Sequence, residues 1–327
     1  MADGAPLHAT MSTRSAMPGL IAVFVVFAIV ATFFGNGYSA NLILWIALAM
    51  LSASSMRFVL LIGELNFATA AFYGIGAYGA GYLSTVLEAP FALALLAGGV
   101  IAALISALFG FVTLKTKGPY FLLIGFAFTE VIRLVYTRVN AFGGNSGMVG
   151  MFPPAAIAAH FPMVAVIIAS LCVVALYRIE RSSFGKLFVA IRDNDSVVQS
   201  IGIDVHLVKV LCFVIASFVA GIAGSLHAFA NNVISPGDFG FLLSTFALAY
   251  LKVGGEDTIF GPLAGATLLV LLGSAAMSMG AGEHVFYGAA IVIAVVAMPK
   301  GVVGLLDAGW RRVVPARRVA SNAGRTE

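Results

Sequence analysis

The sequence predicts an all-α, polytopic membrane protein, and three observations lead to this fold class. Of its 327 residues, 61% are hydrophobic and 10% are charged, whereas about a quarter of an ordinary soluble domain is charged. The apolar residues form about ten runs near the length that crosses a bilayer as a helix. The lysines and arginines fall mainly in alternate connections between these runs, which is the pattern of the positive-inside rule.

Each apolar run is a candidate membrane helix, and together they predict a transmembrane domain over residues 18–306. The runs lie near 18–35, 41–62, 66–87, 90–114, 120–138, 161–178, 207–230, 240–252, 259–279 and 284–298. Segment 240–252 is too short to cross a bilayer alone, and segment 66–87 is rich in glycine and opens on the polar stretch 63–66. Irregular backbone at membrane depth must be buried in protein or line a cavity, so broken or re-entrant helices are expected at both places.

The distribution of cations predicts the orientation. With the N-terminal segment 1–17 in the cytoplasm, nearly all cations outside the spans lie on the cytoplasmic side, and Arg138 lies on the outer side. The basic tail, 307–327, is then cytoplasmic as well, and the turn-rich connection 140–160 faces outward. No basic stretch is interleaved with aromatic residues, so a nucleic-acid partner is not expected.

Residues 181–206 form the longest polar segment, and they lie between two apolar runs. Apolar residues recur there at i, i+3, i+4 and i+7, which predicts an amphipathic helix. Its apolar stripe consists of Phe184, Leu187, Phe188 and Ile191. Ser182 or Ser183 can cap the start of this helix, because a serine hydroxyl accepts a bond from a free backbone N–H.

A second short helix is expected in the same segment, beginning at Asp195 or Ser196 and ending at Gly202. The residues expected to be buried on it are Val197, Val198 and Ile201. A pair of amphipathic helices between spans is either a docking surface for a soluble partner or a segment resting on the lipid surface.

The polar start of segment 66–87 is the predicted neighbour of a cargo route. Asn66 and Thr69 interrupt apolar sequence, and Phe72 and Tyr73 follow them. Backbone groups in such a break need cavity water or protein partners. The alternative for these four residues is a helix–helix contact that takes no part in transport.

Two further polar groups lie inside apolar runs. Glu130 is followed at i+3 by Arg133, so the two side chains can pair on one helix face. This pair either lines a pathway or joins two helices. His227 stands alone in the run 207–230 and is expected to be a helix residue whose ring nitrogens are satisfied.

Nothing in the sequence predicts covalent chemistry. It contains no Walker lysine loop, GxSxG elbow or HExxH helix. Its two cysteines, Cys172 and Cys212, lie inside apolar runs, so neither a disulfide nor a metal centre is expected. The chain is therefore not expected to be an enzyme or to bind a cofactor of its own.

Five groups of residues, in order along the chain, resemble the permeases of branched-chain amino-acid ABC importers, the LivM type. The first four are the glycine-rich stretch 71–78, the stretches 117–120 and 128–133, the outer stretch 143–154, and the cytoplasmic residues Phe184-Gly185-Lys186, Ala190-Ile191-Arg192-Asp193-Asn194, Ile201-Gly202-Ile203 and Lys209. The fifth consists of the C-terminal glycines and prolines between 254 and 305. The resemblance runs over residues 40–307.

The resemblance implies a subunit of a type II ABC importer in the bacterial inner membrane. Such a chain forms its translocation path with a second, homologous permease and receives cargo from an external substrate-binding protein. Two cytoplasmic ATPase subunits hold the ATP and Mg²⁺, and their closure tilts the spans. The implied cargo is a branched-chain amino acid, or a related small amino acid or amide. The implied coupling loop is 181–206, with ATPase contacts at Phe184, Gly185, Leu187, Phe188, Ala190, Ile191, Asp193, Asn194 and Gly202.

The chain departs from the family pattern at two places. Asn66, Ala68 and Thr69 stand where a serine, a glycine and a histidine or glutamine are usual, and Glu256-Asp257 follow Gly254-Gly255 where the family has Gly-Gly-x-Gly. The first departure lies beside the predicted route and leaves the cargo open. Urea, short amides, an aromatic acid and a simple sugar are alternatives within the same machine.

Readings from other classes also stay open at this point. A secondary transporter would use Glu130 and Arg133 as a proton or ion relay. A membrane enzyme is a further alternative, although no catalytic constellation supports it.

Overall fold

The computed structural model describes residues 19, 22–25, 37–116, 118–278, 288 and 301–304, and it confirms the all-α prediction. The α-helices of this part are α2 (Tyr38–Leu60), α3 (Thr69–Thr85), α4 (Phe91–Thr113), α5 (Pro119–Arg138), α6 (Ala155–Ala158), α7 (Phe161–Arg181), α8 (Ser183–Asp193), α9 (Asp195–Ser200), α10 (Val205–Asn231), α11 (Phe241–Gly254) and α12 (Phe260–Ser278). The 3-10 turns are η1 (Asn140–Phe142), η2 (Gly144–Ser146) and η3 (Pro236–Phe239). Two-residue strands β1 (Met148–Val149) and β2 (Val233–Ile234) pair antiparallel, with Met148 opposite Ile234.

Five of the described helices are long and apolar enough to cross a membrane: α2, α4, α5, α7 and α10. α11 and α12 are shorter apolar helices, and α3 has 17 residues. The predicted spans 18–35 and 284–298 and the terminal segments 1–17 and 307–327 lie wholly or largely outside the described residues. The described helices are those of a multi-pass membrane protein.

Small residues let α3 and α10 pack backbone against backbone, with α4 beside both. A methyl group on Gly76 of α3 would overlap the Gly221 carbonyl of α10, and one on Gly224 of α10 would overlap the Tyr73 carbonyl of α3. The Ser225 hydroxyl of α10 donates to the Gly76 carbonyl at 3.1 Å. Close contact of this kind stabilises helix pairs in lipid, where apolar burial alone adds little.

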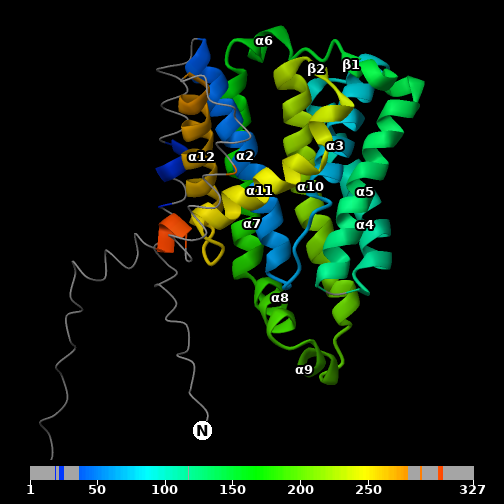
Figure 1. The fold of residues 1–327 in the computed structure, drawn as a ribbon, viewed down its shortest axis with the longest axis vertical. Helices are drawn as coiled ribbons and strands as arrows, with labels where there is room; N and C mark the ends of the chain where they lie inside the picture. The colour runs from blue at the N-terminus through cyan, green and yellow to red at the C-terminus, as the bar shows by residue number, and fades with distance from the viewer. Residues whose placement is uncertain are drawn as a thin grey trace, which may run out of the picture.

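The expected break before α3 is present. α2 ends at Leu60, and a non-helical stretch leads to α3, which begins partway along the bundle (Figure 1). The Phe67 carbonyl accepts hydrogen bonds from Ser244 of α11 at 2.8 Å and from Thr129 of α5 at 3.1 Å. The Ala70 amide donates to the Ser244 hydroxyl at 3.0 Å. Neighbouring helices therefore satisfy the broken backbone, as its depth requires.

The short segment expected at 240–252 is α11, which has 14 residues. It runs obliquely across the bundle between α10 and α12 (Figure 1). Before it, Ser235 and Asp238 form a capping box on η3. On its other side, Gly265 of α12 lies so close that a methyl group there would overlap the Tyr250 carbonyl. Contacts with its neighbours hold α11, which does not span the bundle alone.

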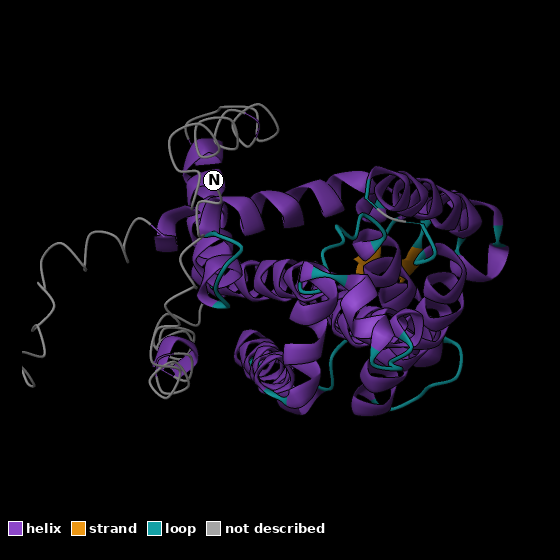
Figure 2. Cartoon of the chain, turned by 90° about the horizontal axis from the view of Figure 1, so that it is seen from below, coloured by secondary structure: helices purple, strands orange, loops and turns teal. Residues whose placement is uncertain are grey.

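The two ends of the bundle carry different elements. α8 and α9 lie at one end, and α6, β1 and β2 lie at the other (Figure 1). Lys186 and Ser146 are therefore at opposite ends of the molecule. Figure 2, seen from below, shows the helices of the bundle end-on, with the two short strands partly hidden behind them.

Candidate functional site

A cavity of about 480 Å³ opens among α2, α3, α10, α11 and α12. Its lining residues are Tyr38, Leu42, Trp45, Leu48, Ala49, Ser52, Tyr73, His227, Leu243, Phe246, Tyr250, Val270, Gly273 and Ser274. None of these is a lysine, arginine, aspartate or glutamate, and the polar groups are hydroxyls, one indole and one imidazole. Such a wall suits a small ligand that is largely apolar and makes few polar contacts.

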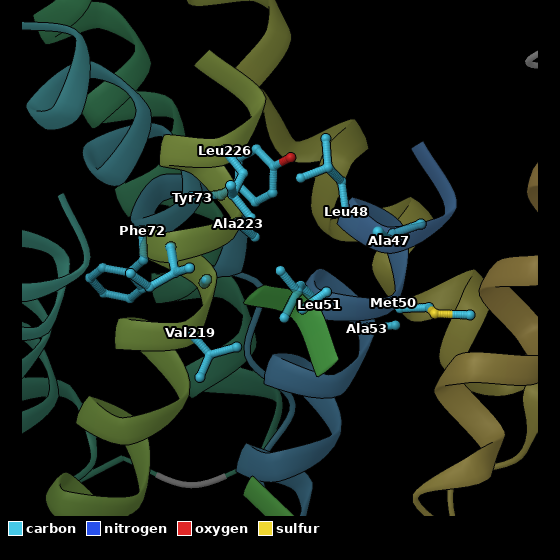
Figure 3. Packing of buried hydrophobic residues seen from close by; sticks show 14 of the residues in the cluster. Ala47, Leu48, Met50, Leu51, Ala53, Phe72, Tyr73, Val219, Ala223 and Leu226 are labelled. Carbon is cyan, nitrogen blue, oxygen red and sulfur yellow. The ribbon is translucent and has the colours of Figure 1, made fainter. Parts of the chain in front are cut away.

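α2 supplies one long wall of this cavity. Its lining residues are spaced mostly three or four apart, so they share one helix face: Tyr38, Leu42, Trp45, Leu48, Ala49 and Ser52. At the start of the helix, the Tyr38 hydroxyl is hydrogen-bonded to Ser274 of α12. One face of α2 is therefore directed toward the cavity, while the Leu51 side chain points toward α10 (Figure 3).

Three polar side chains are hydrogen-bonded in a line on α10 and α3, and two of them, His227 and Tyr73, line the cavity. The Asn231 amide nitrogen lies 2.9 Å from Nε2 of His227, and Nδ1 of the same ring lies 3.2 Å from the Tyr73 hydroxyl. An amide nitrogen only donates, so Nε2 accepts and the neutral ring carries its proton on Nδ1. That proton is donated to the Tyr73 oxygen, which leaves the phenolic proton for an acceptor in the cavity.

Of the four residues predicted to lie near a route, the structure brings one, Tyr73, to the cavity wall. Figure 3 shows its hydroxyl directed toward Leu48 of α2, while the neighbouring Phe72 ring points to the other side of α3. Phe72 is fully buried, and its ring centroid lies 5.4 Å from that of Phe213. Successive residues of a helix point about 100° apart, and here the Phe72 ring packs on the Phe213 side of α3, outside the cavity lining.

Asn66 and Thr69 organise the start of α3 and do not line the cavity. The Asn66 side-chain oxygen accepts from the Ala68 amide at 3.0 Å, and the Thr69 hydroxyl donates to the Asn66 carbonyl at 2.8 Å. Both residues are buried, and the Asn66 amide nitrogen has no hydrogen-bond partner among the described atoms. Their observed hydrogen bonds are local to residues 66–69, at the break before α3.

His227 was predicted to be a satisfied helix residue, and both of its nitrogens have partners. Its ring also lines the cavity and meets Trp45 edge-on, with the ring centroids 5.3 Å apart. The sequence signal for this second role is the polar pair His227 and Asn231 at i and i+4, which share one face of an otherwise apolar run.

The predicted pair on α5 is formed, and it lies outside the cavity lining. Nε of Arg133 lies 2.7 Å from Oε2 of Glu130, and both side chains are partly exposed. The other oxygen of Glu130 accepts from the Phe241 amide at 3.4 Å, at the start of α11. The Glu130 carboxylate therefore connects α5 to the first turn of α11.

The segment 181–206 forms the two expected helices. The Ser182 hydroxyl accepts from the Phe184 amide at 3.2 Å at the start of α8. The Asn194 side-chain oxygen accepts from the backbone amides of Ser196 and Val197 at the start of α9. Gly202 follows α9 with φ +84°, a left-handed conformation that favours glycine.

The apolar stripe predicted on α8 is only partly buried. Phe188 and Ile191 are buried, and the Phe188 ring meets Phe58 of α2 edge-on, with the ring centroids 5.8 Å apart. Gly185 is also buried, and any side chain there would overlap the Glu180 carbonyl. Phe184, by contrast, is 54% exposed. Leu187 is partly buried, while Ala190, Asp193, Asn194 and Gly202 are exposed.

On α9 the burial prediction was wrong for two of three residues. Val198 is buried, but Val197 and Ile201 are largely exposed. A helix of six residues turns only one side toward the bundle, and Val197 and Ile201 lie four residues apart on the other side. Together with Phe184 they are the large exposed apolar side chains of the segment 183–202, which we call the α8–α9 surface.

The class of protein follows from these features: an all-α, multi-pass membrane protein with a cavity between its helices and an amphipathic helix pair at one end. The comparison with known families identifies the particular family. Residues 38–295 match the family described as the permease component of branched-chain amino acid transport systems, and the chain belongs to it.

Individual relatives come from two kinds of importer. The branched-chain amino acid permease LivM of Escherichia coli K12 is 25% identical over 269 residues, which cover 73% of this chain. The matched region spans 63% of the length of that relative. The ribose import permease RbsC of Haemophilus influenzae is 24% identical over 80% of this chain and 84% of its own length. No solved structure matches the chain.

Proposed function

We propose that this chain is the membrane permease subunit of an ATP-driven importer for branched-chain amino acids or related small amino acids and amides. It carries out no covalent reaction and holds no cofactor. Family membership supports the transport role, because the matched relatives are permeases. The single observation that supports a route in this chain is the uncharged cavity with two hydrogen-bonded polar side chains on its wall, His227 and Tyr73, the first of which Asn231 also contacts.

The cavity composition favours a small cargo with an aliphatic side chain. Leucine, valine, alanine and aromatic residues on the wall can pack against such a side chain. The Tyr73 proton can be donated to a carboxylate or amide oxygen of the cargo. A wall without fixed charge holds a zwitterion weakly, which suits a path that must release its cargo.

The proposed partners follow from the same family. A second homologous permease completes the path, and an external substrate-binding protein delivers cargo at the end that carries β1 and β2. Two ATPase subunits, which hold ATP and Mg²⁺, dock on the α8–α9 surface. Its exposed Phe184, Val197 and Ile201 support this contact, because an apolar side chain that the bundle leaves uncovered can anchor a partner.

A simple sugar is the second candidate for the cargo. The ribose permease relatives cover more of this chain and of themselves than the LivM match does. The hydroxyl groups on the cavity wall could hydrogen-bond a sugar, and they belong to Tyr38, Ser52, Tyr73, Tyr250 and Ser274.

Uptake by the reconstituted complex tests the proposal. Proteoliposomes containing the permeases, the ATPases and the binding protein should accumulate radiolabelled leucine or valine only with internal ATP and Mg²⁺. Accumulation of ribose but not of amino acids would replace the first cargo by the second. Uptake that persists without ATP and collapses with the proton gradient would favour a secondary transporter.

Thiol labelling tests the proposed orientation in the bacterial inner membrane. In a background without Cys172 and Cys212, Ser146→Cys and Lys186→Cys place single thiols at opposite ends of the bundle. With both termini cytoplasmic, an impermeant reagent added to intact spheroplasts should label Ser146→Cys and spare Lys186→Cys. The reverse pattern would overturn the orientation and the ATPase contact together.

A further inference from the structure

Arg57 is a buried charge at the end of α2 that none of the predictions used. It is 4% exposed, and its guanidinium contacts two other segments of the chain. Nη1 and Nη2 donate to the two carboxylate oxygens of Glu180, at the end of α7, at 2.8 Å each. Nε donates to the Glu256 carbonyl at 3.1 Å, and Nη2 reaches the Asp257 carbonyl at 3.5 Å. One side chain thus joins α2, α7 and the connection from α11 to α12.

The partners of Arg57 lie beside the α8 helix. The backbone carbonyl of Glu180 leaves no space for a side chain at Gly185, so α8 rests directly on the end of α7. Phe58, the next residue of α2, meets the buried Phe188 ring of α8. A displacement of α8 must therefore move the end of α7 and the end of α2 or break these contacts.

Three helices linked at Arg57, which are α2, α11 and α12, also line the cavity. α2 supplies one wall, α11 contributes Leu243, Phe246 and Tyr250, and α12 contributes Val270, Gly273 and Ser274. The connection between α11 and α12 contains the two carbonyls that Arg57 contacts. The guanidinium thus links α2 by hydrogen bonds to the end of α7, on which α8 packs, and to the connection between two other cavity-lining helices, α11 and α12.

The chemistry of this contact is specific for arginine. A guanidinium is planar and presents several donors, so it can bind both oxygens of one carboxylate and still reach two carbonyls. A lysine ammonium keeps the charge but cannot reproduce the fork. Replacing Arg57 by lysine therefore separates the geometry of the contact from its charge.

We infer that Arg57 is a positioning residue that passes movement of α8 to the cavity wall by holding α7 and the α11–α12 connection to α2. The inference rests on the proposed function, since it takes the α8–α9 surface as the place where the ATPases act. A merely structural contact would make the protein less stable without changing how much cargo moves for each ATP hydrolysed.

The test compares Arg57→Lys and Glu180→Gln with Arg178→Lys, an exposed arginine on the same last turn of α7. Each complex is reconstituted with its ATPases and binding protein, and uptake, basal hydrolysis and binding-protein-stimulated hydrolysis are measured for equal amounts of assembled complex. Arg57→Lys and Glu180→Gln should keep basal hydrolysis within about twofold and lose on the order of tenfold in cargo moved per ATP, within the usual range of coupling between sites. Arg178→Lys should match the wild type. An unchanged ratio of cargo to ATP in both variants would overturn the inference, even if less complex assembles.

A second measurement needs no transport assay and tests the Arg57 contacts in the subunit itself. Hydrogen exchange of the subunit alone in detergent should become faster in Arg57→Lys at both 180–193 and 255–259, and stay unchanged in Arg178→Lys. Unchanged exchange, or faster exchange at only one of these segments, would show that Arg57 does not join them. If the wild-type complex shows no ATP-driven uptake, the proposed function fails. Faster hydrogen exchange at both segments in Arg57→Lys would still show that Arg57 holds them together.

Discussion

The cavity and the α8 end of the bundle hold their polar groups in opposite ways. The cavity wall carries hydroxyls and a neutral imidazole but no ionisable carboxylate or cation. At the α8 end, two buried cations, Arg57 and Lys209, each pair with a carboxylate, on Glu180 and Asp195. A buried charge needs a fixed, complementary partner, whereas a hydroxyl can exchange one partner for another. This difference matches the two roles we propose, a cavity for a changing occupant and an α8 end that transmits position.

The first prediction tests whether α8 is anchored as part of the bundle. Phe188→Ala removes a fully buried ring that packs on Phe58. We expect a loss of about 3–5 kcal/mol of stability from this truncation. Thermal or chemical unfolding of the purified subunit in detergent measures it. Phe152→Ala, at an exposed position near the other end, is the control and should cost far less. Equal costs for both would mean that α8 is not packed as described.

The second prediction uses the same helix four residues earlier. Phe184→Ala removes an exposed ring, so stability should change little, while binding of the ATPases should weaken by about 2 kcal/mol, or about 30-fold in Kd. Co-purification and a titration of the ATPases against the subunit in nanodiscs measure this effect. If affinity holds but the subunit leaves anionic vesicles more readily, the segment rests on lipid and the docking proposal is wrong.

The third prediction concerns the polar line in the cavity. Tyr73→Phe deletes one hydroxyl, which is also the partner of Nδ1 of His227, and keeps the ring, so the packing of α3 should survive. Loss of one hydrogen bond to the cargo should raise the concentration for half-maximal uptake by a factor of about 5–10, which corresponds to about 1–1.5 kcal/mol. Tyr82→Phe, outside the cavity lining, is the matched control. Identical uptake by both variants, over several cargoes, would remove Tyr73 from the route.

The smallest effect is expected at the pair on α5. Glu130→Gln removes one charge of a partly exposed pair and keeps a side-chain oxygen for the Phe241 amide. Stability should fall by no more than about 1 kcal/mol, and uptake should stay within about twofold. Uptake assays at several pH values provide the measurement. A collapse of transport with a shifted pH dependence would instead support an ion relay through Glu130 and Arg133.

Local patterns predicted the parts of this fold that depend on near neighbours in the chain. The helix start at Ser182 and the end at Gly202 depend on residues within a few positions, and they formed as expected. The pair Glu130–Arg133 formed for the same reason. The second helix begins at Asp195, one of the two expected starts, and Asn194 caps it, which was not predicted. Local patterns did not predict which side of α9 would be covered, because two faces of a short helix can both be apolar and only the neighbouring helices decide between them.

The sequence by itself determined that this is a multi-pass helical membrane protein with irregular segments near 66 and 240 and a capped helix pair at 181–206. Composition and spacing suffice for that, since every backbone group in a bilayer needs a partner within the protein. Only the tertiary structure decided that Tyr73 lines the cavity while Asn66 and Thr69 brace a helix start, and that Arg57 joins three segments up to 200 positions apart. Such contacts depend on how helices pack, and no spacing along the chain encodes which distant carboxylate or carbonyl a side chain will meet.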